Sequence, residues 1–147
     1  MPLAGTTLYL TRTFAAPRHK VFEAWTRPEV ISQWFAASEE HVPSVAEVDL
    51  RVGGSYRIGM KHIAKGTEHI ATGVYKEIVP DERLVFTWSW EENPNENETL
   101  ITIEFRDANG STEMHFRHER FATVKLRDDH QHGWAGCLER LARAMIL

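Results

Sequence analysis

The chain has 147 residues, with 42% apolar residues, 10% aromatic residues and a formal net charge of -4 at pH 7. A chain of this length buries enough apolar surface to fold as one domain without a disulfide or a metal, and its single cysteine cannot form an internal bridge. No basic block suggests a nucleic-acid partner, and no run approaches the roughly 20 uninterrupted apolar residues of a membrane span.

The cysteine content and the first residues favour a cytoplasmic location. The sequence M-P-L-A-G-T-T has neither the basic segment nor the apolar segment of a secretory signal peptide. A lone cysteine, Cys137, suits a reducing compartment. We expect a single domain over residues 1–147, because no linker, internal repeat or low-complexity tract interrupts the chain.

The first third of the chain predicts one strand followed by two short helices. Apolar and polar residues alternate over residues 7–14, which is typical of a strand. Pro17 suits the first turn of a helix, and apolar residues follow at helical spacing up to Trp25. A second short helix is expected over residues 30–35, before a polar stretch at residues 36–44.

From residue 45 onward the apolar period changes to two, and turn residues recur at short spacing. This pattern predicts an antiparallel meander. The expected strands cover residues 45–50, 55–60, 69–79, 83–91, 99–107 and 112–121. The clearest turn is Asn109-Gly110, since these residues readily adopt the positive φ angles of a tight hairpin. Another turn is expected at residues 93–97.

The last segment predicts one long helix over residues 129–145, with Asp128 or Asp129 as its N-terminal cap. Its apolar side chains form a stripe wide enough to face a core. The stripe consists of Trp134, Cys137, Leu138, Leu141 and Met145. Gly133 and Gly136 lie away from the stripe, where they either let another backbone approach or weaken the start of the helix.

The order of these elements predicts an α+β fold. Hairpin-connected strands build an antiparallel sheet, here of about seven strands, and the single long helix must cover one face of it. We therefore expect a curved sheet wrapped around the C-terminal helix, with the two short helices between the first two strands.

Several short segments carry a resemblance to a known superfamily. They are F-A-A-P at residues 14–17, V-F-E-A-W-T at 21–26, W-F at 34–35, D-L-R-V-G-G-S-Y at 49–56, G-V-Y at 73–75, P-D-E-R-L-V-F-T-W at 80–88 and G-W at 133–134. The chain resembles the START-like, or SRPBCC, superfamily, and within it the branch similar to the C-terminal domain of the activator of the heat-shock-protein-90 ATPase. The resemblance implies the helix-grip fold and a cavity between sheet and helix. It implies no particular reaction, because the superfamily includes lipid carriers, polyketide cyclases and hormone receptors.

The cavity predicts a binding site for a small apolar or aromatic molecule, without a cofactor. Strand alternation identifies the side chains that face the helix, and a solid packed core of the same residues is the alternative interpretation. The expected ligand contacts are Tyr75, Phe86, Trp88, Ile101, Ile103, Phe105, Met114, Phe116, His118, Trp134, Leu138 and Leu141.

Two other functions stay open. One is a cyclase- or dehydratase-type enzyme that uses His118, Tyr75 and Glu77 as acid–base groups in the same cavity. The other is a protein-interaction domain, although the half of the eukaryotic activator that docks on the chaperone has no counterpart here. A protein partner is left open, as is the choice between monomer and homodimer.

No metal site or nucleophile is expected. His115 and His118 point to opposite faces of a strand, and His130 and His132 are about 200° apart on a helix. Cys137 lies on the apolar stripe, where it is expected to act as a small buried hydrophobe. Motifs of hydrolases, phosphate-binding loops and dinucleotide-binding folds are absent from the sequence.

Overall fold

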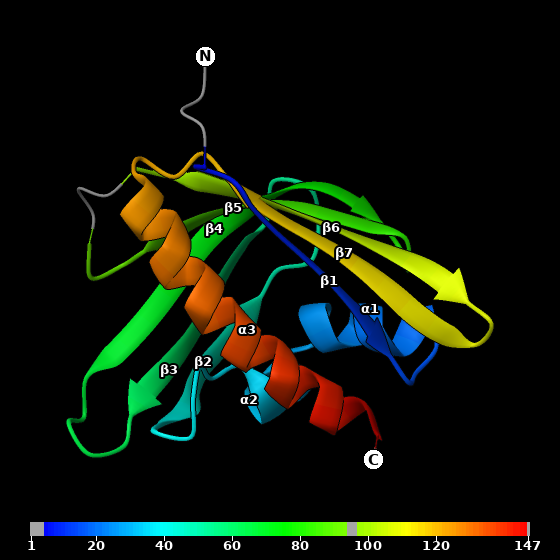
Figure 1. Cartoon of the computed structure of the whole chain (residues 1–147), viewed down its shortest axis with the longest axis horizontal. Coiled ribbons are helices and arrows are strands. Elements are labelled where there is room, and N and C mark those ends of the chain that lie inside the picture. Colours follow the sequence, from blue (N-terminus) through cyan, green and yellow to red (C-terminus); the bar gives the residue numbers. More distant parts are fainter. Residues whose placement is uncertain (1–4, 94–96, 147) are drawn as a thin grey trace.

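The computed structural model describes residues 5–93 and 97–146, which form a seven-stranded sheet and three helices (Figure 1). The strands are β1 (Leu8–Phe14), β2 (His41–Val48), β3 (Ser55–His62), β4 (Glu68–Val79), β5 (Arg83–Trp90), β6 (Thr99–Ala108) and β7 (Ser111–Glu119). The helices are α1 (Arg18–Thr26), α2 (Pro28–Trp34) and α3 (Val124–Ile146).

The sheet is antiparallel throughout, in the order β1-β7-β6-β5-β4-β3-β2, so β1 and β2 form its edges. Burial alternates along β7, where Met114, Phe116 and His118 are buried and their neighbours are half-buried. Figure 1 shows α3 lying across the curled face of the sheet. The inward side chains of β7 and the buried side chains of α3 belong to one core. The predicted α+β helix-grip fold is confirmed.

Helices α1 and α2 lie between the first two strands, as predicted, and extend the core. Pro17 is the N-cap residue of α1, and Pro28 is the first residue of α2, where its missing N–H has no helical partner to lose. Trp25 and Trp34 are buried and pack edge to face, with ring centroids 4.9 Å apart. The indole of Trp34 also donates a hydrogen bond to the carbonyl of Ala24, at 2.8 Å.

Strand β2 begins at His41, so the predicted start at residue 45 is wrong. The strand includes Pro43, and its pairing with β3 shifts register between Pro43 and Val45. A proline lacks an N–H and is tolerated at an edge strand or a bulge. Because β2 is an edge, the proline does not end the strand.

Helix α3 begins at Val124, so the predicted start and the predicted aspartate cap are also wrong. The hydroxyl of Thr123 accepts the backbone N–H of Leu126, at 3.1 Å, which is the hydrogen bond of an N-cap. Asp129 lies within the helix and pairs with Lys125, at 3.0 Å. Leu126 packs against the core and extends the apolar face by one turn. No helix in the described part of the chain is long and apolar enough to cross a membrane.

The predicted hairpin at Asn109-Gly110 is confirmed. The two residues have φ angles of 55° and 90° and join β6 directly to β7. The turn predicted at residues 93–97 falls mainly on residues 94–96, which lie outside the described residues.

Candidate functional site

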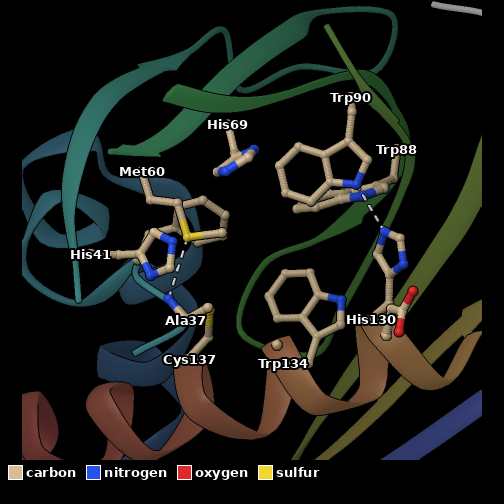
Figure 2. Close-up of a pocket in the computed structure, with 12 residues that line it drawn as sticks. Ala37, His41, Met60, His69, Trp88, Trp90, His130, Trp134 and Cys137 are labelled. Carbon is tan, nitrogen blue, oxygen red and sulfur yellow. Dashed lines mark hydrogen bonds between the residues drawn. The ribbon is translucent and has the colours of Figure 1, made fainter. Parts of the chain in front are cut away.

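A pocket of about 280 Å³ lies between the first half of α3 and one end of the sheet (Figure 2). Side chains from α3 form one wall, and side chains from β2, β3, β4 and β5 face them. The segment after α2 completes the enclosure. The lining residues are Phe35, Ala37, His41, Met60, His69, Trp88, Trp90, Asp129, His130, Gly133, Trp134 and Cys137.

Three indoles give the pocket its apolar character. The ring centroids of Trp88 and Trp134 are 5.1 Å apart, and those of Trp88 and Trp90 are 5.2 Å apart and nearly perpendicular. Trp90 donates its indole N–H to Nε2 of His130 at 2.9 Å, as Figure 2 shows. Because Nε2 accepts, the ring proton is on Nδ1 and is donated to the carbonyl of Leu126, at 2.8 Å. His130 therefore fixes the orientation of Trp90.

A second histidine, His118, fixes the indole of Trp134 from inside the core, and its ring packs edge to face with that of Trp88, at 5.7 Å. The indole N–H of Trp134 donates to Nδ1 of His118, at 3.1 Å. Nε2 then carries the proton and donates it to the hydroxyl of Thr99, at 2.7 Å, and that hydroxyl donates to the carbonyl of Trp88, at 3.1 Å. Burial, with a smaller effect of His130, lowers the pKa of His118 well below its ordinary value. His118 is therefore a neutral residue that positions the pocket wall.

The two glycines of α3 have different roles. A Cβ at Gly136 would lie 1.9 Å from the carbonyl oxygen of Ala37, so the missing side chain lets this backbone lie against the helix. A Cβ at Gly133 would meet nothing within 4 Å, and Gly133 lines the pocket. Close approach of the Ala37 backbone thus explains why residue 136 is a glycine. At residue 133, the missing side chain leaves space in the pocket.

Histidines from three strands gather at the other end of the pocket. The ring centroid of His41 lies 5.0 Å from that of His62 and 6.2 Å from that of His69. Burial lowers the pKa of His41, and the two neighbouring rings add to this effect. His69 pairs with Glu92 at 2.8 Å, and His62 pairs with Glu40 at 3.4 Å. Within residues 5–93 and 97–146, no three His, Cys, Asp or Glu side chains are placed to share a metal ion.

Cys137 lies on the pocket wall as a thiol. Its side chain is 3% exposed, and burial raises its pKa to about 12. The thiolate is the nucleophilic form of cysteine, so at neutral pH Cys137 contributes an apolar surface to the pocket.

Trp88 and Trp134 are the predicted contact residues that line the pocket. The others are buried in the packed core and lie outside the pocket lining. They are Tyr75, Phe86, Ile101, Ile103, Phe105, Met114, Phe116, His118, Leu138 and Leu141. Strand alternation identified inward side chains, but α1, α2 and the α3 stripe fill most of the space in front of them.

The predicted acid–base residues do not meet in the pocket. The pairing of β4 with β5 shifts register between Tyr75 and Glu77, so the two side chains do not share a face. Tyr75 is buried, and burial raises its pKa. Glu77 is exposed and pairs with Arg83, at 3.1 Å. Both ring nitrogens of His118 are already hydrogen-bonded.

Sequence reasoning missed most of the pocket lining. Trp90 shares the alternation of Trp88 along β5, and the unexplained Gly133 was a second available signal. His41, Met60 and His69 carried no such signal, because they approach one another only when β2, β3 and β4 pair at their ends.

Residues 15–145 match the family model described as "Activator of Hsp90 ATPase homolog 1-like protein". The chain belongs to this family. The curated relatives it matches include the activator of 90 kDa heat shock protein ATPase homolog 1 of Homo sapiens and that of Mus musculus, each 26% identical over 105 residues. The match covers 71% of this chain and 27% of each relative, so the chain spans about a quarter of their length.

Solved structures share the fold of this Hsp90-ATPase-activator-like chain over nearly its whole length. A crystal structure of a Chromobacterium violaceum protein has a TM-score of 0.86 and 27% identity, covering 95% of this chain and 96% of that one. A solution structure of an AHSA1-like protein from Aeromonas hydrophila has a TM-score of 0.73 and 21% identity, covering 93% and 91%. The family and the fold are consistent with a ligand-binding domain.

Proposed function

We propose that the protein binds a small apolar or aromatic molecule in the pocket between the sheet and α3, without covalent chemistry. The observation that supports this function is the unfilled space beside Gly133, faced by Trp88, Trp90 and Trp134. A pocket of about 280 Å³ with mainly apolar, aromatic walls is typical of a small-molecule binding site.

The rigidity of the walls supports binding over simple loose packing. Trp90 is held by His130, and Trp134 is held by His118, so two indoles are oriented before any ligand arrives. A site that is already ordered loses little conformational entropy on binding. Flat aromatic rings also offer large contact areas to a flat ligand.

The proposal includes a cytoplasmic location and no cofactor. The single Cys137, which is buried as a free thiol, supports a reducing compartment. The acid–base alternative receives less support, because its candidate groups are buried in hydrogen bonds or exposed outside the pocket.

A neutral fluorophore tests the proposal directly. We expect N-phenyl-naphthylamine to gain fluorescence on titration with the protein and to alter tryptophan emission, because its rings would lie against the indoles. Gly133→Leu should fill the pocket and weaken uptake at least tenfold. His132→Leu, which adds the same side chain at the neighbouring exposed position, should bind like the parent.

Two outcomes would redirect the proposal. Equal uptake by Gly133→Leu and the parent would place the binding site elsewhere. No response across a panel of apolar probes would favour the protein-interaction alternative, which is suggested by the names of the curated relatives.

A further inference from the structure

We propose that the molecule bound in this pocket carries an anionic group, which His41 and Arg140 bind while the indoles bind its apolar body. This inference rests on the proposed function and adds the chemical class of the ligand. It follows from a histidine that lines the pocket and an arginine one helical turn beyond it, neither of which makes an ion pair with an acidic side chain among the described residues.

Arg140 lies one helical turn beyond Cys137, the last residue of α3 that lines the pocket. Residues 133 and 140 are two helical turns apart and project roughly 20° from each other, and Gly133 lines the pocket. Arg140 is half-buried. Its positive charge reaches two lining residues: after burial and the neighbouring histidines, it helps to lower the pKa of His41, and it acts on Cys137 one turn earlier.

The guanidinium of Arg140 makes no ion pair or hydrogen bond with the part of the chain that the structure describes. The nearest acidic residue along the helix, Glu139, pairs with Arg12 at 2.9 Å and with Arg143 at 3.9 Å. Partly burying a charge without a counter-charge is unfavourable. An anion in the pocket would supply that counter-charge.

Three acidic side chains around the pocket have histidine or lysine partners. Glu92 pairs with His69 at 2.8 Å, Glu40 with His62 at 3.4 Å, and Asp129 with Lys125 at 3.0 Å. Among the described residues, Arg140 and the ring of His41 make no ion pair with an acidic side chain. Figure 2 shows His41 at the edge of the pocket, beside Met60.

His41 offers a hydrogen-bond donor to this space. The hydroxyl of Ser38 accepts the backbone N–H of Glu40, at 3.2 Å, and is hydrogen-bonded to Nδ1 of His41, at 2.9 Å. When Ser38 donates to Nδ1, or when the ring is protonated, Nε2 of His41 carries a proton. Nε2 has no hydrogen bond to the described residues. A donor and a guanidinium at one end of an apolar pocket match a carboxylate or sulfonate on an aromatic body.

The test compares two probes that share one aromatic body. Anilinonaphthalene sulfonate carries a permanent anionic group, and N-phenyl-naphthylamine lacks it. We expect Arg140→Gln to weaken the anionic probe about tenfold, the loss of one charge-assisted hydrogen bond, and to leave the neutral probe within twofold. Arg143→Gln removes the same charge one turn further along and should leave both affinities within twofold.

The pH dependence supplies a second readout. Protonation of His41 adds a positive charge at the site, so the anionic probe should bind more tightly as the pH falls from about 7.5 to 5.5. His41→Gln should lose this dependence, whereas Arg143→Gln should retain it. The groups that face His41 are Ser38 and Glu40 from its own segment, His62 from β3, His69 from β4 and Arg140 from α3.

The outcomes separate this inference from the proposed function. Equal losses for Arg140→Gln and Arg143→Gln, or equal losses for both probes, would overturn the anionic ligand and leave apolar binding intact. Failure of both probes to bind the parent, or their full uptake by Gly133→Leu, would instead contradict the proposed function itself.

Discussion

His118 links the core of the protein to its pocket. Its side chain is fully buried, accepts from Trp134 and donates to Thr99. A histidine in such a place is neutral, because burial disfavours its charged form. The indole of Trp134 is thus hydrogen-bonded to, and that of Trp88 packed against, one residue that does not line the pocket.

The neutral state of His118 predicts an acid-sensitive fold. Its pKa in the folded chain lies below that of the unfolded chain, near 6.5, so protonation favours unfolding. Stability should be complete above about pH 6.5 and should fall as the pH decreases toward the folded-state pKa. His118→Gln should cost roughly 1–3 kcal/mol at pH 7, but its free energy of unfolding should fall less between pH 7 and 5.5.

Urea unfolding at several pH values measures this dependence. His115→Gln, on the other face of β7, is the matched control and should retain the slope of the parent. An unchanged slope in His118→Gln would mean that another group causes the acid sensitivity.

The two glycines of α3 predict opposite effects of one substitution. Alanine is favoured over glycine inside a helix by up to about 1 kcal/mol, so Gly133→Ala should stabilise the protein by roughly 0.5–1 kcal/mol. Gly136→Ala should instead destabilise it by roughly 1–3 kcal/mol, because the new Cβ would overlap the Ala37 carbonyl. Thermal unfolding of both variants checks this. A shift in the same direction for both would contradict the close approach at Gly136.

At the level of elements, the N-terminus of α3 depends on Thr123. The helix begins one turn earlier than its aspartates suggested, since Thr123 caps the N–H of Leu126. Thr123→Ala should lower the free energy of unfolding by roughly 0.5–2 kcal/mol. Asp128→Ala, at an exposed position inside the helix, should change it by less than about 0.5 kcal/mol. Chemical denaturation distinguishes the two variants. A larger effect at Asp128 would mean that α3 begins at the aspartates and not at Thr123.

One wall of the pocket is built on β2, an edge strand of the sheet. β2 begins at His41 and, among the described strands, pairs with β3 alone. The segment after α2 is fixed to the rest of the fold by the Ala37–Gly136 approach and by the backbone N–H of Ala37, which donates to the sulfur of Met60 at 3.3 Å. These contacts hold one wall of the pocket in place.

At the scale of the whole molecule, one core joins both ends of the described chain. Leu8 from β1 and Met145 from α3 belong to the same buried cluster as Trp25 and Trp134. We therefore expect a single cooperative unfolding transition. Far-ultraviolet circular dichroism and tryptophan fluorescence should give the same denaturation midpoint. Two separated transitions would show that residues 1–147 do not act as one domain.

The sequence by itself determined the elements, their order and the fold class. Alternation placed Met114, Phe116 and His118 on the buried face of one strand, and helical spacing placed Trp134 and Leu138 on the buried face of α3. These patterns are local, because the side-chain directions of a strand or a helix follow from backbone geometry over a few residues. The short motifs that resemble the heat-shock ATPase activator also predicted the family, which the family model confirms.

Only the tertiary structure decided where space remains inside the fold. Burial of Ile103 and Phe105 was predictable, but their distance from the pocket was not, because α1 and α2 fill the space before them. Trp88 and Trp134 line the pocket because the space beside them, next to Gly133, is left unfilled. His41 and Arg140 come near each other only through the pairing of β2 and the crossing of α3. A cavity is what packed segments leave between them, and that volume depends on contacts between residues far apart in the chain.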